Sequence, residues 1–164
     1  MSPGRSSWSG TTEPSSRSVA ITLAQNTSLG TYPIYAFGSD EQKQEWMPQL
    51  CSGQALAGFG LTEPEAGSDA GNVRTTARED DGEWVVNGAK QFITNAGTDI
   101  SGGVTITART GDEEISNIIV PKGTPGYEVG EAYRKMGWNA SDTRPLSFDD
   151  ARVPEENLLG PRGM

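Results

Sequence analysis

A turn-rich stretch at residues 59–69 (Phe-Gly-Leu-Thr-Glu-Pro-Glu-Ala-Gly-Ser-Asp) combines backbone irregularity with hydrogen-bonding side chains. Pro64 fixes its own φ and disfavours a helix before it, and Gly67 permits backbone angles closed to other residues. Successive amides in such a turn can point at one anion or ring carbonyl. Thr62 and Ser68 add hydroxyls nearby. The ordinary alternative is a polar loop that leaves a strand.

A second stretch, residues 87–95 (Asn-Gly-Ala-Lys-Gln-Phe-Ile-Thr-Asn), begins with a hairpin-turn pair. On the strand that follows, Phe92 and Thr94 are expected to point to the same face, because side chains alternate along a strand. An apolar ring beside a hydroxyl suits the face and edge of an aromatic cofactor. The alternative is an ordinary strand with one core phenylalanine.

A third stretch, residues 136–150, places two hydroxyls and both signs of charge in four consecutive positions: Ser141, Asp142, Thr143 and Arg144. The guanidinium of Arg144 could hold a phosphate through two parallel hydrogen bonds. The alternative is a polar loop with a local Asp–Arg pair.

Composition excludes several kinds of protein. The 164 residues carry a net charge of −9, which argues against nucleic acid or an anionic membrane as the main partner. With no histidine, a His-containing catalytic triad and His-ligated metal sites are excluded within the sequence. Cys51 is the single cysteine, so no internal disulfide forms, and a reducing compartment such as the cytoplasm is expected. No apolar run approaches the ~20 residues of a membrane span.

The patterning predicts an α+β fold. Residues 1–17 are rich in serine and are expected to be disordered. A helix over residues 19–29 is expected to end at Gly30 and Pro33. A second helix begins at Ser39 with a capping box and is expected to kink or restart at Pro48.

From residue 55 onward, short strands separated by turn pairs predict an antiparallel β-barrel-like domain. Asp81-Gly82 and Asn87-Gly88 are both expected to form hairpin turns. The expected strands cover residues 55–61, 73–80, 83–86, 89–94, 104–109, 115–120, 127–129 and 146–148.

The order and spacing of these stretches, together with Arg-Val-Pro-Glu-Glu-Asn-Leu-Leu-Gly at residues 152–160, resemble the middle domain of acyl-CoA dehydrogenases. The resemblance implies four parts. Residues 18–53 would be the end of an N-terminal helical domain and 54–154 the middle β-domain. Residues 155–164 would begin a C-terminal helical domain, and 1–17 would precede the resemblance.

The resemblance also implies roles for individual residues around an FAD cofactor. Phe59, Leu61 and Thr62 would bond the polar edge of the isoalloxazine ring. Phe92, Ile93 and Thr94 would cover one ring face, with the Thr94 hydroxyl near N5. Ser68 would face the cofactor's diphosphate or the substrate's pantetheine. The acyl-CoA site would be bordered by Ser141, Asp142, Thr143 and Arg144.

The family reaction removes the α-proton of an acyl-CoA with a carboxylate and passes the β-hydride to the flavin. No residue here matches that base: Glu63 and Asp142 are carboxylates, but neither corresponds to it. A truncated, inactive chain is therefore expected. The resemblance further implies a homo-oligomer that passes electrons to electron-transfer flavoprotein. Two alternatives remain: a flavin oxidase or monooxygenase of the same superfamily, and a non-catalytic β-domain.

Overall fold

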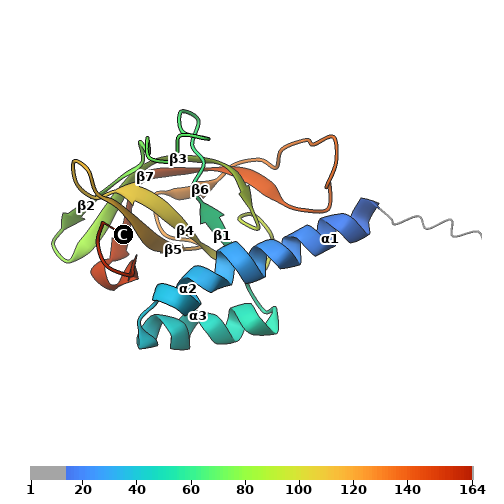
Figure 1. Ribbon diagram of the computed structural model, residues 1–164, viewed down its shortest axis with the longest axis horizontal. Helices are drawn as coiled ribbons and strands as arrows, with labels where there is room; N and C mark the ends of the chain where they lie inside the picture. Colours follow the sequence, from blue (N-terminus) through green and yellow to red (C-terminus); the bar gives the residue numbers. More distant parts are fainter. Residues whose placement is uncertain (1–13, 164) are drawn as a thin grey trace, which may run out of the picture.

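The computed structural model describes residues 14–163, in which helices lie on one side of a curved sheet (Figure 1). The helical elements are α1 (Pro14–Gln25), the π-helix η1 (Asn26–Thr31), α2 (Tyr32–Phe37), α3 (Asp40–Ser52) and the 3-10 helix η2 (Glu155–Asn157). The strands are β1 (Leu56–Gly60), β2 (Thr76–Asp80), β3 (Glu83–Thr94), β4 (Ser101–Arg109), β5 (Ile115–Pro121), β6 (Tyr127–Val129), β7 (Thr143–Pro154) and β8 (Leu158–Leu159).

The strands form one eight-stranded sheet in the order β6-β7-β3-β2-β4-β5-β8, with β1 paired to β4 beside this path. Most neighbours are antiparallel, and the parallel pairs are β1 with β4 and β2 with β4. The predicted α+β fold with an antiparallel-rich sheet is therefore confirmed. Among the described strands no pairing joins β6 to β8, so the sheet is not closed and "barrel-like" describes it only loosely.

The N-terminal helical run is longer than predicted at both ends. It starts at Pro14, inside the range expected to be disordered, most of which lies outside the described residues. It also continues past Gly30 to Phe37, so the predicted end at Gly30 and Pro33 was wrong. Pro33 lies in the first turn of α2, where its missing N–H costs little. A Cβ at Gly30 would lie 2.5 Å from the Ala57 carbonyl oxygen, so this glycine lets the helix approach β1.

Helix α3 begins as predicted. The Ser39 hydroxyl accepts a hydrogen bond from the Gln42 amide, and the Gln42 side chain accepts one from the Ser39 amide, which completes a capping box. The helix runs on through Pro48 without restarting and ends at Gly53, which has a φ of 75°. Of the predicted kink or restart at Pro48, the restart was therefore wrong.

Strand β3 is continuous, so the predicted hairpin turn at Asn87-Gly88 was also wrong. The Asn87 side chain exchanges two hydrogen bonds of 2.9 Å with Asp150 of β7. Gly88 has a φ of 144°, and a Cβ there would lie 2.7 Å from the Thr75 Cα. This glycine therefore serves a bulge with close backbone approach. Strand β7 pairs with most of β3, and it is correspondingly longer than the predicted residues 146–148.

Two apolar clusters hold the fold together. One lies within the sheet and includes Val86, Ile106 and Leu146. The other includes Ile34, Trp46 and Ile119, and so joins α2 and α3 to β5. Helices α2 and α3 thus bury an apolar face by docking on the sheet. Within the described part of the chain, no helix has the length and apolar character needed to cross a membrane.

Candidate functional site

One cavity of about 240 Å³ gathers most of the residues predicted to bind a ring cofactor. It lies between the end of β1, the end of β3 and the helical run. Ligand pockets commonly measure about 300–1,000 Å³, so this one would hold part of a large ligand. Its lining comprises Gln25, Leu29, Phe59, Leu61, Thr62, Phe92, Ile93 and Thr94.

A bulge in β3 shapes one side of this cavity. The pairing of β3 with β7 shifts register between Lys90 and Ile93, and Phe92 has a φ of 61°. A bulky residue at positive φ is uncommon and requires support from its surroundings. Phe92 is 59% exposed and its ring lies 5.2 Å from that of Tyr133, between centroids. The bulge, and not regular strand alternation as predicted, places Phe92 and Thr94 in the same cavity.

The helical side of the cavity was missed by sequence reasoning. Gln25 and Leu29 line it from the junction of α1 and η1. The buried Asn95 side chain donates to Gln25 Oε1 at 2.6 Å and to the Thr22 carbonyl at 3.1 Å, which ties α1 to the end of β3. The four-residue spacing of Gln25 and Leu29 puts them on one helical face, but nothing local indicates which strand that face meets.

Asn26 fastens the same helical run to β1. Its Oδ1 accepts a hydrogen bond of 3.0 Å from the Ala57 amide, and its Nδ2 donates to the Leu50 carbonyl at 3.4 Å. Asn26 is 7% exposed. Since a buried amide needs a partner, this side chain fixes where η1 lies against the strand that leads into the cavity.

The four residues predicted to border the substrate lie at the start of β7, next to the cavity. Thr143 and Arg144 pair with Thr94 and Ile93 of β3. The Arg144 Nε donates to Asp142 Oδ1 at 2.7 Å, so the local Asp–Arg pair exists. The second oxygen of Asp142 accepts from the Gly97 amide, also at 2.7 Å.

Lys135 bonds the other two of these four residues, Ser141 and Thr143. Its ammonium donates to the Ser141 carbonyl at 2.5 Å and to the Thr143 hydroxyl at 2.7 Å. Ser68, by contrast, is exposed in the loop after β1 and does not line the cavity. Of the seven predicted cofactor residues, Ser68 is thus the one that the structure leaves apart from the other six.

Known proteins match the chain across both its helical and its strand regions. Residues 58–151 match the acyl-CoA dehydrogenase middle domain, and residues 11–54 match the acyl-CoA dehydrogenase N-terminal domain. The chain belongs to the acyl-CoA dehydrogenase family. An acyl-CoA dehydrogenase of Bacillus subtilis is 49% identical over 150 residues, which are 90% of this chain and 40% of that protein. The chain thus spans about 40% of the length of this curated relative.

Solved structures agree with this membership. An acyl-CoA dehydrogenase of Bacillus anthracis complexed with FAD has a TM-score of 0.84 and 40% identity, over 89% of this chain and 25% of that chain. A chain in a structure of the electron transferring flavoprotein of Acidaminococcus fermentans also has a TM-score of 0.84. It is 41% identical and covers 89% of this chain and 39% of that chain.

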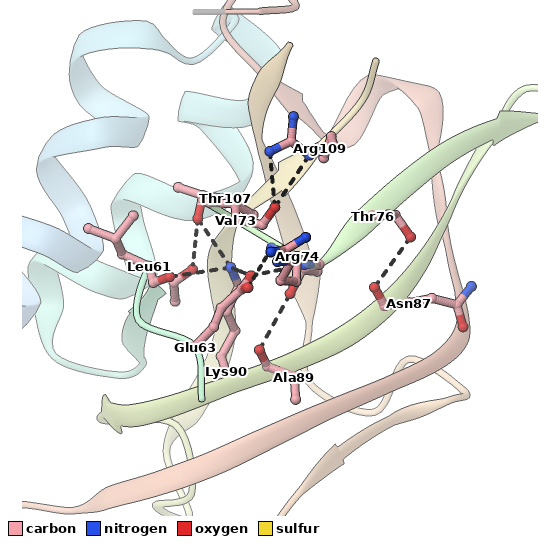
Figure 2. Close-up of polar contacts among 12 residues, drawn as sticks. Leu61, Glu63, Val73, Arg74, Thr76, Asn87, Ala89, Lys90, Thr107 and Arg109 are labelled. Atoms are coloured by element: carbon pink, nitrogen blue, oxygen red, sulfur yellow. Dashed lines mark hydrogen bonds and ion pairs between the residues drawn. The ribbon is translucent and has the colours of Figure 1, made fainter. Parts of the chain in front are cut away.

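The two carboxylates considered in the sequence, Glu63 and Asp142, are both engaged in other contacts. Asp142 pairs with Arg144. Glu63 forms a buried ion pair of 2.7 Å with Lys90 (Figure 2). Burial alone would raise the pKa of the Glu63 carboxyl, but hydrogen bonds from Lys90 and from two backbone amides hold that pKa below its ordinary value.

A larger cavity of about 470 Å³ lies between α3, β5 and η2. Three carboxylates, those of Glu41, Glu45 and Glu156, line it beside Trp46. An anionic cofactor or an acyl-CoA would be repelled by this lining. None of the predicted site residues reaches it, so the smaller cavity remains the candidate site.

Proposed function

We propose that the complete protein dehydrogenates acyl-CoA thioesters with FAD, and that this chain contributes one side of the flavin and substrate sites. The observation that carries the proposal is the cavity itself, because six residues expected to contact a flavin ring line it together. Family membership supports the same reading.

The lining fits an isoalloxazine ring in its chemistry. Apolar side chains of Phe59, Leu61 and Ile93 supply surface for a flat ring, and the hydroxyls of Thr62 and Thr94 supply hydrogen bonds for a polar edge. A bound flavin would accept a hydride from the β-carbon of the substrate. The chain's own residues would orient the ring and exclude water from one of its faces.

Ser68 and the residues at the start of β7 are proposed for the more polar parts of the ligands. Ser68 is exposed on the loop after β1, where a diphosphate or pantetheine could reach it. At the other edge, Ser141, Asp142, Thr143 and Arg144 would border the acyl-CoA. The Arg144 guanidinium supplies positive charge there, although Asp142 already neutralises part of it.

The base is proposed to come from outside these 164 residues. No residue that lines the cavity is a carboxylate, and Glu63 and Asp142 are held by Lys90 and Arg144. The relatives have much sequence that this chain does not cover. Without a positioned base, general-base help of roughly 10²–10⁴-fold is missing. The 164 residues alone are therefore expected to bind FAD weakly and not to dehydrogenate acyl-CoA.

The domain organisation and the partners of the complete protein are a further proposal. The four-part division at residues 17, 53 and 154, an acyl-CoA substrate, a homo-oligomeric state and electron-transfer flavoprotein as acceptor are all expected of the complete protein. The similarity to a chain in the flavoprotein structure from Acidaminococcus fermentans supports the proposed acceptor.

The test is a fluorescence titration of residues 1–164 with FAD, followed by acyl-CoA addition without oxygen. We expect weak, saturable quenching that Thr94→Val weakens further, and no bleaching of the flavin. Thr124→Val, at a hydroxyl outside the cavity lining, is the control and should bind as the unaltered chain does. Absence of saturable quenching would refute the flavin site. Substrate-dependent bleaching would instead show that a carboxylate within the chain serves as the base.

A further inference from the structure

Lys90 is fully buried, although it lies on a strand that ends at the candidate cavity. Its side chain is 0% exposed. The ammonium donates to Glu63 Oε1 at 2.7 Å and to the Thr107 hydroxyl at 3.2 Å, and it reaches the Leu61 carbonyl at 3.4 Å (Figure 2). It therefore connects β3, β4 and the loop that follows β1.

Glu63 extends these connections to the segment before β2. One of its carboxylate oxygens accepts from the Arg74 amide at 2.6 Å, and the other accepts from the Thr75 amide at 3.0 Å. The Glu63 backbone also closes a tight turn with Ala66 through two hydrogen bonds. The Lys90 ammonium and both carboxylate oxygens of Glu63 thus all have hydrogen-bonding partners (Figure 2).

A buried ion pair is by itself weak evidence of a purely stabilising role. Buried ion pairs are costly to desolvate, and two apolar side chains of similar volume are often as stable or more so. Burial lowers the pKa of the Lys90 ammonium, and the Glu63 carboxylate opposes that effect. The pair is held against a real cost, so a role beyond stability is a reasonable inference.

The pair's position relates it to two parts of the cavity lining. Glu63 directly follows Leu61 and Thr62, and Lys90 lies two residues before Phe92. Leu61, Thr62 and Phe92 all line the cavity. The Gln91 amide, next to Lys90, donates to the Thr62 carbonyl at 2.8 Å. The ion pair and this hydrogen bond together join the loop after β1 to β3.

We propose that Lys90 and Glu63 are positioning residues that hold the loop at Leu61 and Thr62 against β3 and so set the spacing of the cavity lining for its ligand. That the ligand is a flavin rests on the proposed function. The positioning itself does not, because it concerns contacts within the chain.

The deciding variant is Lys90→Met/Glu63→Gln in residues 1–164. It removes both charges, nearly conserves volume and keeps one side-chain oxygen, which can accept from one of the amides of residues 74 and 75. The Gln91 amide reports the link between the loop and β3, and its hydrogen exchange is measured without flavin, relative to the core amide of Ile106. FAD affinity is then measured by fluorescence titration.

Positioning predicts that Gln91 exchange becomes about ten-fold faster relative to Ile106 and that FAD affinity falls about ten-fold, even where the double variant is as stable as the unaltered chain. Glu63→Gln alone, which keeps the ammonium and the side-chain shape, should give the same changes in smaller degree. It serves as the deciding variant where Lys90→Met prevents folding.

The matched control is Arg152→Met, which removes two exposed ion pairs, one with Glu83 at the far end of β3 and one with Asp80 at the end of β2. It should change neither measurement. A folded Lys90→Met/Glu63→Gln chain with unchanged Gln91 exchange would overturn the proposal. If the unaltered chain binds no FAD, the proposed function fails, while the exchange measurement still decides whether the pair positions the loop.

Discussion

Replacing Asn26 by alanine should lower the free energy of unfolding more than removal of an exposed asparagine side chain would. The Ala57 amide, in a residue that is 2% exposed, would lose its acceptor. Leaving a buried donor unsatisfied costs about 1–3 kcal/mol. The 3.4 Å contact to the Leu50 carbonyl is too long to add much. A loss of about 2–3 kcal/mol is therefore expected once the small cavity is included.

Urea unfolding of Asn26→Ala and of Asn87→Ala makes the comparison. Asn87 also makes two side-chain hydrogen bonds, but these are exposed to solvent, so its removal should cost about 1 kcal/mol or less. In a chain of this size, the expected loss at Asn26 corresponds to a fall in Tm of about 4–12 °C. Equal losses in the two variants would refute the reasoning, because burial of the Ala57 amide is what separates them.

Three other changes test the site. In the complete enzyme, Thr94→Val should slow flavin reduction several-fold through loss of about 1 kcal/mol, and an unchanged anaerobic stopped-flow rate would count against the role of that hydroxyl. Because the folded pKa of Glu63 is lowered, its ionised form stabilises the fold above its ordinary pKa, and this stabilisation disappears as the pH falls through the folded value. The difference in unfolding free energy between the unaltered chain and Glu63→Gln should therefore shrink as the pH drops below about 4.5, and a constant difference would contradict this. A Cβ at Gly97 would lie 2.0 Å from the Arg144 Nε, so Gly97→Ala should displace the guanidinium from Asp142 and shift its Nε resonance, with a stability change within about 1 kcal/mol.

Turn residues predicted the local conformation correctly where only contacts between neighbouring residues are required. Asp81 and Gly82 have φ values of 56° and 79°, and the flanking residues Asp80 and Glu83 pair as in a two-residue hairpin. The same type of signal at Asn87-Gly88 failed. There the Asn87 side chain bonds a distant strand, and the glycine accommodates a neighbouring backbone, so tertiary contacts decide the conformation.

The candidate site was predicted only for residues that follow one another closely in the sequence. Phe59, Leu61 and Thr62 were identifiable as one group, and Phe92 to Thr94 as another, because each lies in a short recognisable stretch. Gln25 was not, since its place in the cavity depends on Asn95, far away in the sequence. The Lys90–Glu63 pair likewise depends on how β3 meets the loop after β1.

Charged and neutral polar groups occupy different parts of this site. Two ion pairs involve segments next to the lining residues in the sequence or the sheet: Lys90 holds Glu63, and Arg144 holds Asp142. The cavity lining itself presents neutral groups, with hydroxyls at Thr62 and Thr94. The lowered pKa of the Glu63 carboxyl makes it a poor proton acceptor, whereas the neutral hydroxyls of Thr62 and Thr94 suit the polar edge of the proposed flavin ring. On the proposed function, the lining residues would orient the ring, and proton removal would need a carboxylate that no such partner holds.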